Sequence, residues 1–177
     1  MTEIMIPAWV DGVLTPVEKL ETHRRALRHM AVSVFVAQGE EILLQRRAMA
    51  KYHTPGLWTN ACCTHPLWRE PAEACARRRL AEELGIDGLA LSPCGRVEYR
   101  ADVGGGLTEH EVVDLFRAEA PGALSVTPNP DEVMDWRWIR LAALEEEMAS
   151  APDRFTPWLR IYMAEHRDMI FPEVASR

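Results

Sequence analysis

One helix constrains the fold of this chain more than any other segment. Residues 71–84 carry apolar side chains at helical spacing, with Pro71 suited to the first helical position and Gly85 to the C-terminal stop. The apolar stripe consists of Ala72, Cys75, Ala76, Leu80 and Leu84. Because such a stripe must be buried against another element, the helix requires a partner layer.

Strand-like segments on both sides of this helix supply that layer. The predicted elements are a hairpin around Asp11-Gly12, a hairpin of residues 30–36 and 41–46, strands over 96–103 and 107–116 joined by Gly104-Gly105-Gly106, a strand over 136–139, and helices over 141–149 and 157–170. Thr156 is expected as the N-cap of the last helix. The order of these elements predicts an α/β (α+β) sandwich.

Length and charge limit the function classes. A chain of 177 residues suits a single domain over residues 1–177, since cores usually divide only beyond about 250 residues. The chain has 20 Lys and Arg against 27 Asp and Glu, a formal charge of −7. This balance disfavours a broad surface for nucleic acid or for an anionic membrane, so neither is an expected partner.

The cysteines and the N-terminus predict a cytoplasmic protein. Cys62 and Cys63 are adjacent, which is a poor layout for a disulfide framework in a chain of this length. The N-terminus has no basic segment before an apolar stretch, as a signal peptide would. The longest uncharged run, residues 52–68, contains Pro55, Gly56 and Pro66, which a membrane helix would not favour.

Two short patterns could carry chemistry. Cys63 stands two residues before His65, either as a reactive thiol beside a base or metal ligand, or as a packed side chain. Glu109 and Glu111 share one face of a predicted strand, while His110 points to the other. Two adjacent carboxylates either hold a cation or a proton between them, or form a solvated strand face.

The central helix adds a third pattern. Arg78 and Glu82, like Arg79 and Glu83, are four residues apart and can form surface ion pairs. The larger frame, Glu70-x7-Arg78-Arg79-Leu80-x-Glu82-Glu83-Leu84-Gly85-Ile86, resembles the Nudix box, a loop-helix-loop motif whose closing glutamates bind a divalent ion over a diphosphate. Two positions depart from that box: Thr64 replaces its opening glycine, and Arg79 replaces the glutamate after the arginine.

From about Trp9 to Ile170, the chain resembles the type I isopentenyl-diphosphate isomerases, a family with the Nudix fold. The resemblance rests on Pro55-Gly-x-Trp58-Thr-Asn-x-x-Cys63-x-His65-Pro66, Tyr99-Arg-Ala, Glu109-x-Glu111, Asp131-Glu-Val-Met-Asp and Phe155-x-Pro-Trp158. It implies a mixed central sheet between helices. It also implies interconversion of isopentenyl and dimethylallyl diphosphate through a tertiary carbocation, in isoprenoid biosynthesis, by a monomer or weak homodimer.

The resemblance also assigns roles to residues. Cys63 and Glu111 would be the opposing acid and base, with Tyr99 hydrogen-bonded near Glu111. The family's site metal would be held by His23, His29, His65, Glu109 and Glu111. Five such N/O ligands suit Mg²⁺, Mn²⁺ or a substituting Zn²⁺. His23 and His29 are six residues apart, where the family usually has seven. Trp158 either stabilises the carbocation with its indole face or anchors the last helix.

The substrate's diphosphate would have its own set of residues. Glu83 would carry a second cation, Mg²⁺, on the diphosphate. The phosphate clamp would be Lys19, Arg47, Lys51 and Arg79, which include both lysines of the chain. Arg79 would turn a metal-binding position into a phosphate-binding one, because a guanidinium fork suits phosphate oxygens. For Arg47, the other interpretation is a surface cation.

Two other functions compete with an isomerase. A Nudix hydrolase would cleave a nucleoside or dinucleotide diphosphate with a metal-bound water, but Arg79 stands where it needs a metal-binding glutamate. A non-catalytic binding module would have no reason to keep Cys63, His65, Glu109 and Glu111 together.

Overall fold

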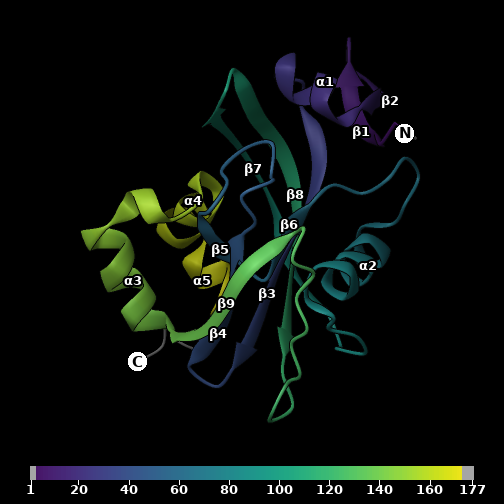
Figure 1. The fold of residues 1–177 in the computed structure, drawn as a ribbon. Coiled ribbons are helices and arrows are strands. Elements are labelled where there is room, and N and C mark those ends of the chain that lie inside the picture. Colours follow the sequence, from purple (N-terminus) through teal and green to yellow (C-terminus); the bar gives the residue numbers. More distant parts are fainter. Residues whose placement is uncertain (1–2, 173–177) are drawn as a thin grey trace.

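In the computed structural model, which describes residues 3–172, nine strands form one mixed sheet with helices on both faces (Figure 1). The strands are β1 (Met5–Val10), β2 (Val13–Glu18), β3 (His29–Gln38), β4 (Glu41–Arg47), β5 (Trp58–Asn60), β6 (Cys62–Thr64), β7 (Ser92–Gly104), β8 (Leu107–Glu119) and β9 (Val133–Arg140). The helices are α1 (Lys19–Arg24), α2 (Ala72–Leu84), α3 (Leu141–Ser150), α4 (Pro157–Glu165) and α5 (Arg167–Ile170), with a 3-10 turn at Pro152–Arg154. The predicted α/β (α+β) fold is confirmed.

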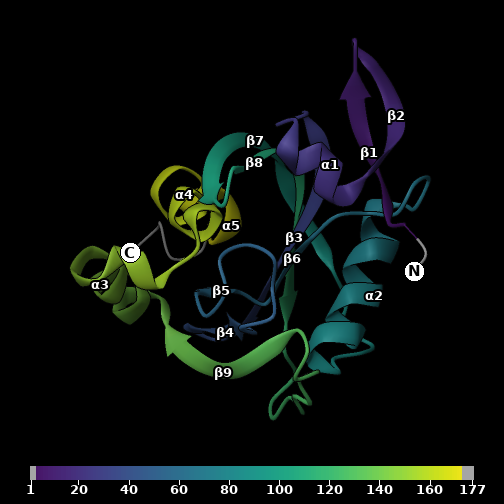
Figure 2. The same ribbon diagram turned by 45° about the horizontal axis from the view of Figure 1, so that its top comes forward.

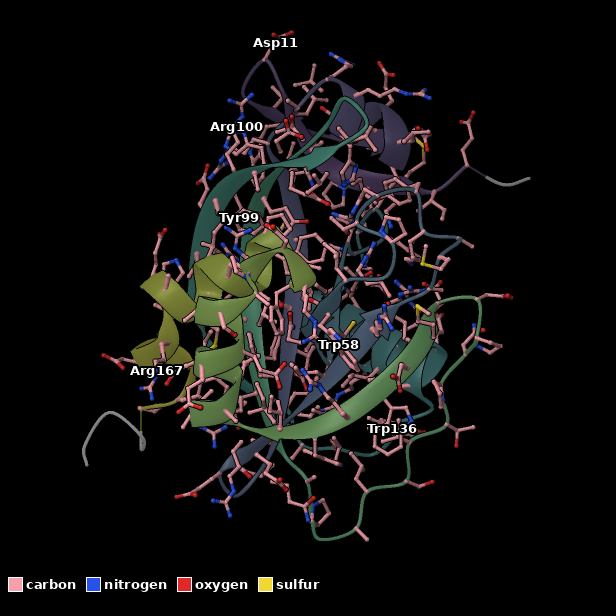
Figure 3. The ribbon with its side chains drawn as sticks, turned by 60° about the vertical axis from the view of Figure 1, so that its left-hand side comes forward. Asp11, Trp58, Tyr99, Arg100, Trp136 and Arg167 are labelled. Carbon is pink, nitrogen blue, oxygen red and sulfur yellow. The ribbon has the colours of Figure 1, made fainter. Side chains whose placement is uncertain are left out.

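Strand β3 separates two apolar cores. Its alternate side chains point to opposite faces, so Phe35 joins one core and Val34 joins the other. Helix α2 covers the face of Val34 through Leu80 and Leu84, whereas α3, α4 and α5 cover the face of Phe35 (Figure 2). Trp58 on β5 lies inside the molecule, and Asp11 lies at the far tip of the β1–β2 hairpin (Figure 3).

Most of the predicted elements are present, with small differences at their ends. Helix α2 ends at Gly85, which takes the left-handed conformation at φ 64°. It begins one residue later than predicted, because Pro71 occupies the N-cap position in an extended conformation. The hairpin of β3 and β4 pairs only at its turn, since β4 then pairs with β9 and β3 pairs with β6 and β8.

The predicted helix over 157–170 is two helices. It breaks at His166, whose φ of −129° lies outside the helical region, and restarts when the amides of Met169 and Ile170 donate to the His166 carbonyl. The second piece turns Ile170 and Phe171 into the core beside Phe35. Thr156 occupies the N-cap position as predicted, but its hydroxyl donates to Thr59 instead of capping the helix.

The topology brings three chain segments together at one end of β3. Strand β8 runs parallel to β3 and places Glu111 beside His29. Strand β6 runs antiparallel to β3, so the residue that follows it, His65, lies at the same end. Helix α1 leads directly into this end of β3 and contacts β8. Among residues 3–172, no helix combines the length and the apolar character needed to span a membrane.

Candidate active site

Two histidines are aimed into the site by backbone carbonyls. His23 Nδ1 lies 2.6 Å from the Lys19 carbonyl oxygen within α1, and His29 Nδ1 lies 2.7 Å from the Leu27 carbonyl oxygen. A carbonyl only accepts a hydrogen bond, so each Nδ1 carries a proton and donates. Each Nε2 therefore faces the site, which is the arrangement of a metal-ligating histidine.

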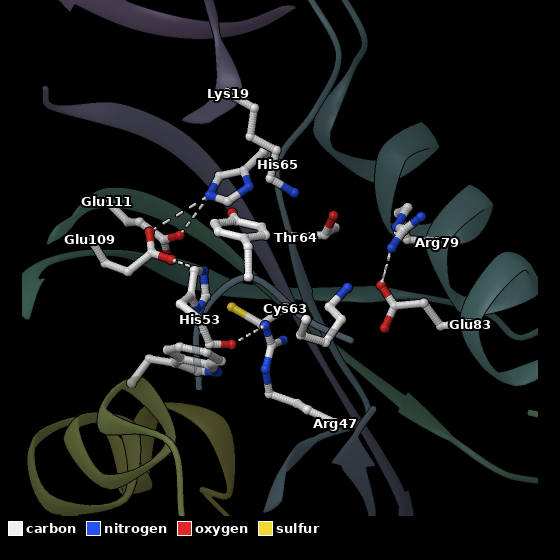
Figure 4. Close-up of a pocket in the computed structure, with 13 residues that line it drawn as sticks. Lys19, Arg47, His53, Cys63, Thr64, His65, Arg79, Glu83, Glu109 and Glu111 are labelled. Carbon is white, nitrogen blue, oxygen red and sulfur yellow. Dashed lines mark hydrogen bonds and ion pairs between the residues drawn. The ribbon is translucent and has the colours of Figure 1, made fainter. Parts of the chain in front are cut away.

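Strand β8 supplies two carboxylates from one face. Glu109 and Glu111 are buried and point inward, while His110 points outward and contacts the exposed Glu98. This is the alternation that the sequence predicted, and it excludes the alternative of a solvated strand face for the two glutamates. Figure 4 shows both carboxylates at one side of the pocket, with His65 and His53 directed toward them.

These side chains form a group that we call the His/Glu cluster: His23, His29, His65, Glu109 and Glu111. Glu109 Oε2 lies 3.1 Å from His23 Nε2 and 3.3 Å from His29 Nε2. His65 Nε2 lies 3.2 Å from His29 Nε2 and 2.9 Å from Glu111 Oε1. Ligands about 2.1 Å from one ion and at right angles lie about 3.0 Å apart, so these spacings match a shared cation.

Unpartnered atoms in the cluster give an independent test of this match. Among the described residues, His23 Nε2 and Glu109 Oε2 are buried and form no hydrogen bond of good geometry, although they lie 3.1 Å apart. Such atoms are costly inside a protein unless an ion or another group completes them. The residues therefore fit a divalent cation, and the shorter spacing between His23 and His29 does not keep His23 away from the cluster.

The electrostatics of the cluster also call for positive charge. Burial acts against ionisation of His29, but hydrogen bonds to Glu109 and Glu111 outweigh it and raise the pKa of His29 to about 10. Burial would raise the pKa of Glu109, but the surrounding histidines hold it well below its usual range. For His65, burial prevails and lowers the pKa. The two neighbouring buried carboxylates therefore require positive charge beside them.

Cys63 and Glu111 lie on the lining of the same pocket. Burial raises the pKa of Cys63, and the carboxylates of Glu111 and Glu109 raise it further, so the thiol keeps its proton at neutral pH. Its sulfur lies 4.0 Å from the Tyr162 hydroxyl. On the other side, the Tyr99 hydroxyl donates a 2.6 Å hydrogen bond to Glu111 Oε2. Burial and the Glu111 charge raise the pKa of Tyr99, which keeps it a donor.

Trp158 forms an apolar wall of the pocket. It is almost completely buried, and its indole N–H donates to Thr59 Oγ1 at 2.8 Å. Thr59 also accepts the hydroxyl of Thr156 at the start of α4. The guanidinium carbon of Arg47 lies 5.3 Å from the centre of the Trp158 ring. The orientation of the indole is therefore fixed by β5 at one end and by a cation over its ring.

A second group, which we call the Lys/Arg network, consists of Lys19, Lys51, Arg79, Glu83 and Glu132. All of these except Glu132 line the opposite side of the pocket. Arg79 donates to Glu83 Oε1 at 2.6 Å and lies 3.3 Å from Glu132 Oε1. Lys51 also pairs with Glu132. Burial lowers the pKa of Lys19 to about 8, with repulsion from Lys51 and Arg79 adding to the effect. Such crowding of cations favours an incoming anion.

Arg47 is tied to the backbone of the pocket wall. It is buried, so it is not the surface cation of the alternative interpretation, whereas its neighbour Arg46 turns to the Gly56 carbonyl. Nε donates to the Thr54 carbonyl and Nη2 to the His53 carbonyl, each at 3.2 Å. Nη1 takes no part in these two bonds.

Helix α2 forms the two ion pairs predicted from the four-residue spacing, Arg78 with Glu82 and Arg79 with Glu83. Arg78 forms a two-point ion pair with Glu70, at 2.7 and 2.8 Å, which closes the loop before the helix. Glu83 is buried and accepts from Gln45 Nε2 at 2.8 Å. Cys62 points to this face of the sheet, with its sulfur 3.9 Å from Glu83 Oε1. It is fully buried in the α2 core, as expected for a structural thiol.

Sequence reasoning missed three side chains that the fold brings to the site: His53, Glu132 and Tyr162. His53 Nε2 lies 2.9 Å from Glu109 Oε1. Glu132 lies in the quoted Asp131-Glu-Val-Met-Asp run, so its motif was noticed but its charge pairing was not. His53 and Tyr162 have no spacing that links them to Glu109 or Cys63, and only the tertiary structure reveals them.

Comparison with known proteins agrees with this geometry. The NUDIX domain family matches residues 27–159. Isopentenyl-diphosphate Delta-isomerase of Rhodobacter capsulatus is 61% identical over 176 residues, which cover 99% of this chain and 100% of that protein. The enzyme of the same name from Cereibacter sphaeroides is 66% identical over 171 residues, covering 97% and 96%. The chain belongs to the isopentenyl-diphosphate Delta-isomerase family, within the Nudix superfamily. The resemblance inferred from its motifs is thereby confirmed.

Two solved structures share the isomerase fold at low identity. A protein from Deinococcus radiodurans has a TM-score of 0.72 at 14% identity, covering 93% of this chain and 100% of that one. A MutT NUDIX hydrolase from Burkholderia pseudomallei has a TM-score of 0.59 at 24% identity, covering 78% and 98%. At these identities the likeness establishes the fold alone.

Proposed function

We propose that this protein is an isomerase that interconverts isopentenyl diphosphate and dimethylallyl diphosphate. The observation that carries the proposal is one pocket with three parts: a His/Glu cluster, a thiol with an opposing carboxylate, and a Lys/Arg network (Figure 4). The family relationship supports the same reaction. A hydrolase is less well supported, because Arg79 replaces an acid that hydrolases use to bind metal.

The Lys/Arg network would bind the diphosphate. Lys19, Lys51 and Arg79 offer charged donors at one end of the pocket, and Arg47 lines it from the strand side. Glu83 lies beside Arg79 and would hold Mg²⁺ against the diphosphate oxygens. Binding at this end leaves the five-carbon unit in the interior, between Cys63, Glu111 and Trp158.

The His/Glu cluster would hold a divalent cation, which we assign as Mn²⁺, Mg²⁺ or Zn²⁺. When bound, such a cation supplies positive charge that offsets the repulsion between the neighbouring carboxylates of Glu109 and Glu111. His23, His29 and His65 would bind it through Nε2. Glu109 would bind through Oε2, and Glu111 through Oε1, since Glu111 Oε2 is engaged by Tyr99.

Cys63 and Glu111 would carry the two proton transfers, one on each face of the substrate. One group donates a proton to the terminal methylene carbon, and the π electrons form that C–H bond and leave a tertiary carbocation. The other group removes a proton from the carbon next to the one that bears the diphosphate. The electrons of that C–H bond form the new double bond with the cationic carbon. The raised pKa of Cys63 keeps its proton available for donation.

Trp158 would stabilise the cationic intermediate. An indole face attracts a cation by about 2 kcal/mol or more when water is excluded. The buried position of Trp158 and the anchoring of its N–H on Thr59 keep that face within the pocket wall. Tyr99 would hold Glu111 in place by its short hydrogen bond.

The test is an incubation with isopentenyl diphosphate and Mg²⁺ in D₂O, with product analysis by NMR. The isomerase incorporates deuterium into carbon and forms dimethylallyl diphosphate. Release of phosphate without carbon-bound deuterium would establish a hydrolase instead, and absence of turnover with metal bound would favour a binding module.

We further propose a cytoplasmic enzyme that functions as a monomer or weak homodimer, with residues 1–177 as one domain. The thiols of Cys62, Cys63 and Cys75 inside the fold support a reducing compartment.

A further inference from the structure

His53 is a buried histidine at the site to which the mechanism above gives no role. Its Nε2 lies 2.9 Å from Glu109 Oε1, and its Nδ1 lies 3.0 Å from the Thr54 hydroxyl. Because a carboxylate only accepts hydrogen bonds, Nε2 carries the proton. Nδ1 is then an acceptor, and the Thr54 hydroxyl donates to it.

Glu109 divides its two oxygens between different surroundings. Oε2 lies 3.1 Å from His23 Nε2 and 3.3 Å from His29 Nε2, inside the cluster. Oε1 faces His53. Among the described residues, the ligand atoms that lie within 4.8 Å of one another come from His23, His29, His65 and Glu109. His53 does not belong to that set, and it contacts the set through Glu109 Oε1.

The segment that carries His53 is held in a strained conformation. Thr54 has φ +46°, which is unfavourable for a β-branched residue and is typically retained where function requires it. Arg47 donates to the carbonyls of both His53 and Thr54. The His53 ring packs edge-on against Tyr52 and Trp158, at 4.4 and 5.8 Å between ring centres. These contacts hold the ring beside Glu109.

We propose that His53 is a positioning residue that restricts Glu109 to binding the divalent cation through Oε2 alone. The inference rests on the proposed function only for the presence of that cation. By occupying Oε1, the Nε2–H group prevents the carboxylate from rotating to chelate the ion with both oxygens. One position around the ion is thereby kept free of a second oxygen from Glu109.

The experiment measures Co²⁺ binding to the metal-free full-length protein, without substrate. His53→Ala is compared with His53→Gln, whose amide N–H can stand where Nε2–H stands, and with His110→Ala, which removes the outward histidine of β8. Partners of this kind typically change metal affinity by 10 to 100-fold. We expect His53→Ala to change the Co²⁺ affinity about tenfold and to shift the visible absorption spectrum, because Glu109 Oε1 becomes free to bind the ion. We expect His53→Gln and His110→Ala to behave like the wild type.

Three results would overturn the proposal. The first is wild-type affinity and spectrum in His53→Ala. The second is failure of His53→Gln to restore either property. The third is a smaller number of nitrogen ligands on Co²⁺ in His53→Gln than in the wild type, measured by electron spin-echo spectroscopy. That result would make His53 a ligand itself. If His53→Ala does not fold, His53→Asn takes its place, since its amide is too short to reach Oε1. Failure of the D₂O assay would leave these readings unchanged, so the two proposals fail separately.

Discussion

The His/Glu cluster and the Lys/Arg network face one pocket but neutralise their charges in opposite ways. In the cluster, His23 Nε2 and Glu109 Oε2 are buried and form no hydrogen bond of good geometry among the described residues. In the network, Arg79 pairs with Glu83 and Glu132, and Lys51 also pairs with Glu132. The His/Glu cluster lacks a positive charge to balance its carboxylates, whereas the Lys/Arg network has paired most of its charges within the protein.

This difference predicts two kinds of binding. A cation in the His/Glu cluster would complete the two buried atoms His23 Nε2 and Glu109 Oε2, so its occupancy should stabilise the fold. An anion that enters the Lys/Arg network competes with Glu132 for Lys51 and Arg79. Part of its binding free energy is therefore spent on separating these ion pairs, which suits a substrate that must also leave.

The largest expected effect tests whether the chemistry lies in the pocket between the two groups. Cys63→Ala should lower the isomerisation rate about 10³-fold, as expected for loss of a general acid or base. Cys62→Ala should keep most of the activity, because Cys62 faces the α2 core on the other side of the sheet. Steady-state rates with isopentenyl diphosphate measure both, and the reverse ranking would show that the wrong thiol has been assigned.

The next effect concerns metal and stability. Adding Mn²⁺ or Zn²⁺ to metal-free protein at about 100 times its Kd should raise the free energy of unfolding by about 2.7 kcal/mol. His29→Gln should lose most of that increase, whereas Lys51→Met should retain it. Thermal unfolding with and without metal gives the comparison. Equal loss in both variants would mean that the two groups are not separate sites.

A smaller effect tests whether Glu132 competes with the anion for Lys51 and Arg79 or instead positions these two cations to bind it. Glu132→Gln frees Lys51 and Arg79 from an ion pair worth about 1 kcal/mol, so the Kd for inorganic pyrophosphate should fall about fivefold. Titration calorimetry measures this change. Glu82→Gln is the matched control, because Glu82 also pairs with Arg79 but is exposed. Weaker binding in Glu132→Gln would show that Glu132 organises the cations instead of competing for the anion.

The smallest expected effect concerns the outer face of β7 and β8, where Glu98 pairs with Arg28 and His110 in contact with solvent. Arg28, with a smaller contribution from His110, lowers the pKa of Glu98 to about 2, although slight burial opposes the shift. A lowered carboxyl pKa adds stability above about pH 4.5 that is lost as the pH falls through 2. Because the pair is exposed, its contribution should stay below about 1 kcal/mol. Acid unfolding of Arg28→Ala measures it, and a larger change would contradict the assignment of this pair to the surface.

The sequence predicted local features where neighbouring residues decide the conformation. Gly85 ends α2 because the left-handed turn there suits glycine, and Glu109 and Glu111 share a face because strand side chains alternate. The prediction of one terminal helix over 157–170 was wrong. No proline or glycine marks the break at His166, and the packing of Ile170 and Phe171 into the core accompanies it.

The family motifs predicted more residues of the site than the local patterns did. The residues in motif order, including Cys63, His65 and Glu111, do line one pocket, although their catalytic and binding roles stay predictions. From the sequence alone, the short spacing between His23 and His29 did not show whether both histidines reach the same site. The short turn after α1 places both Nε2 atoms near Glu109 Oε2, because backbone carbonyls orient each ring.

The sequence by itself therefore determined the family, most of the secondary structure and the residue types available for chemistry, since these depend on short-range spacing and motif order. The tertiary structure alone decided which charges meet. Glu132 reaches Lys51 and Arg79, and His53 reaches Glu109, across separations in the chain that carry no periodic signal. Contacts of that kind depend on how strands and loops pack, and that packing is set by the whole core.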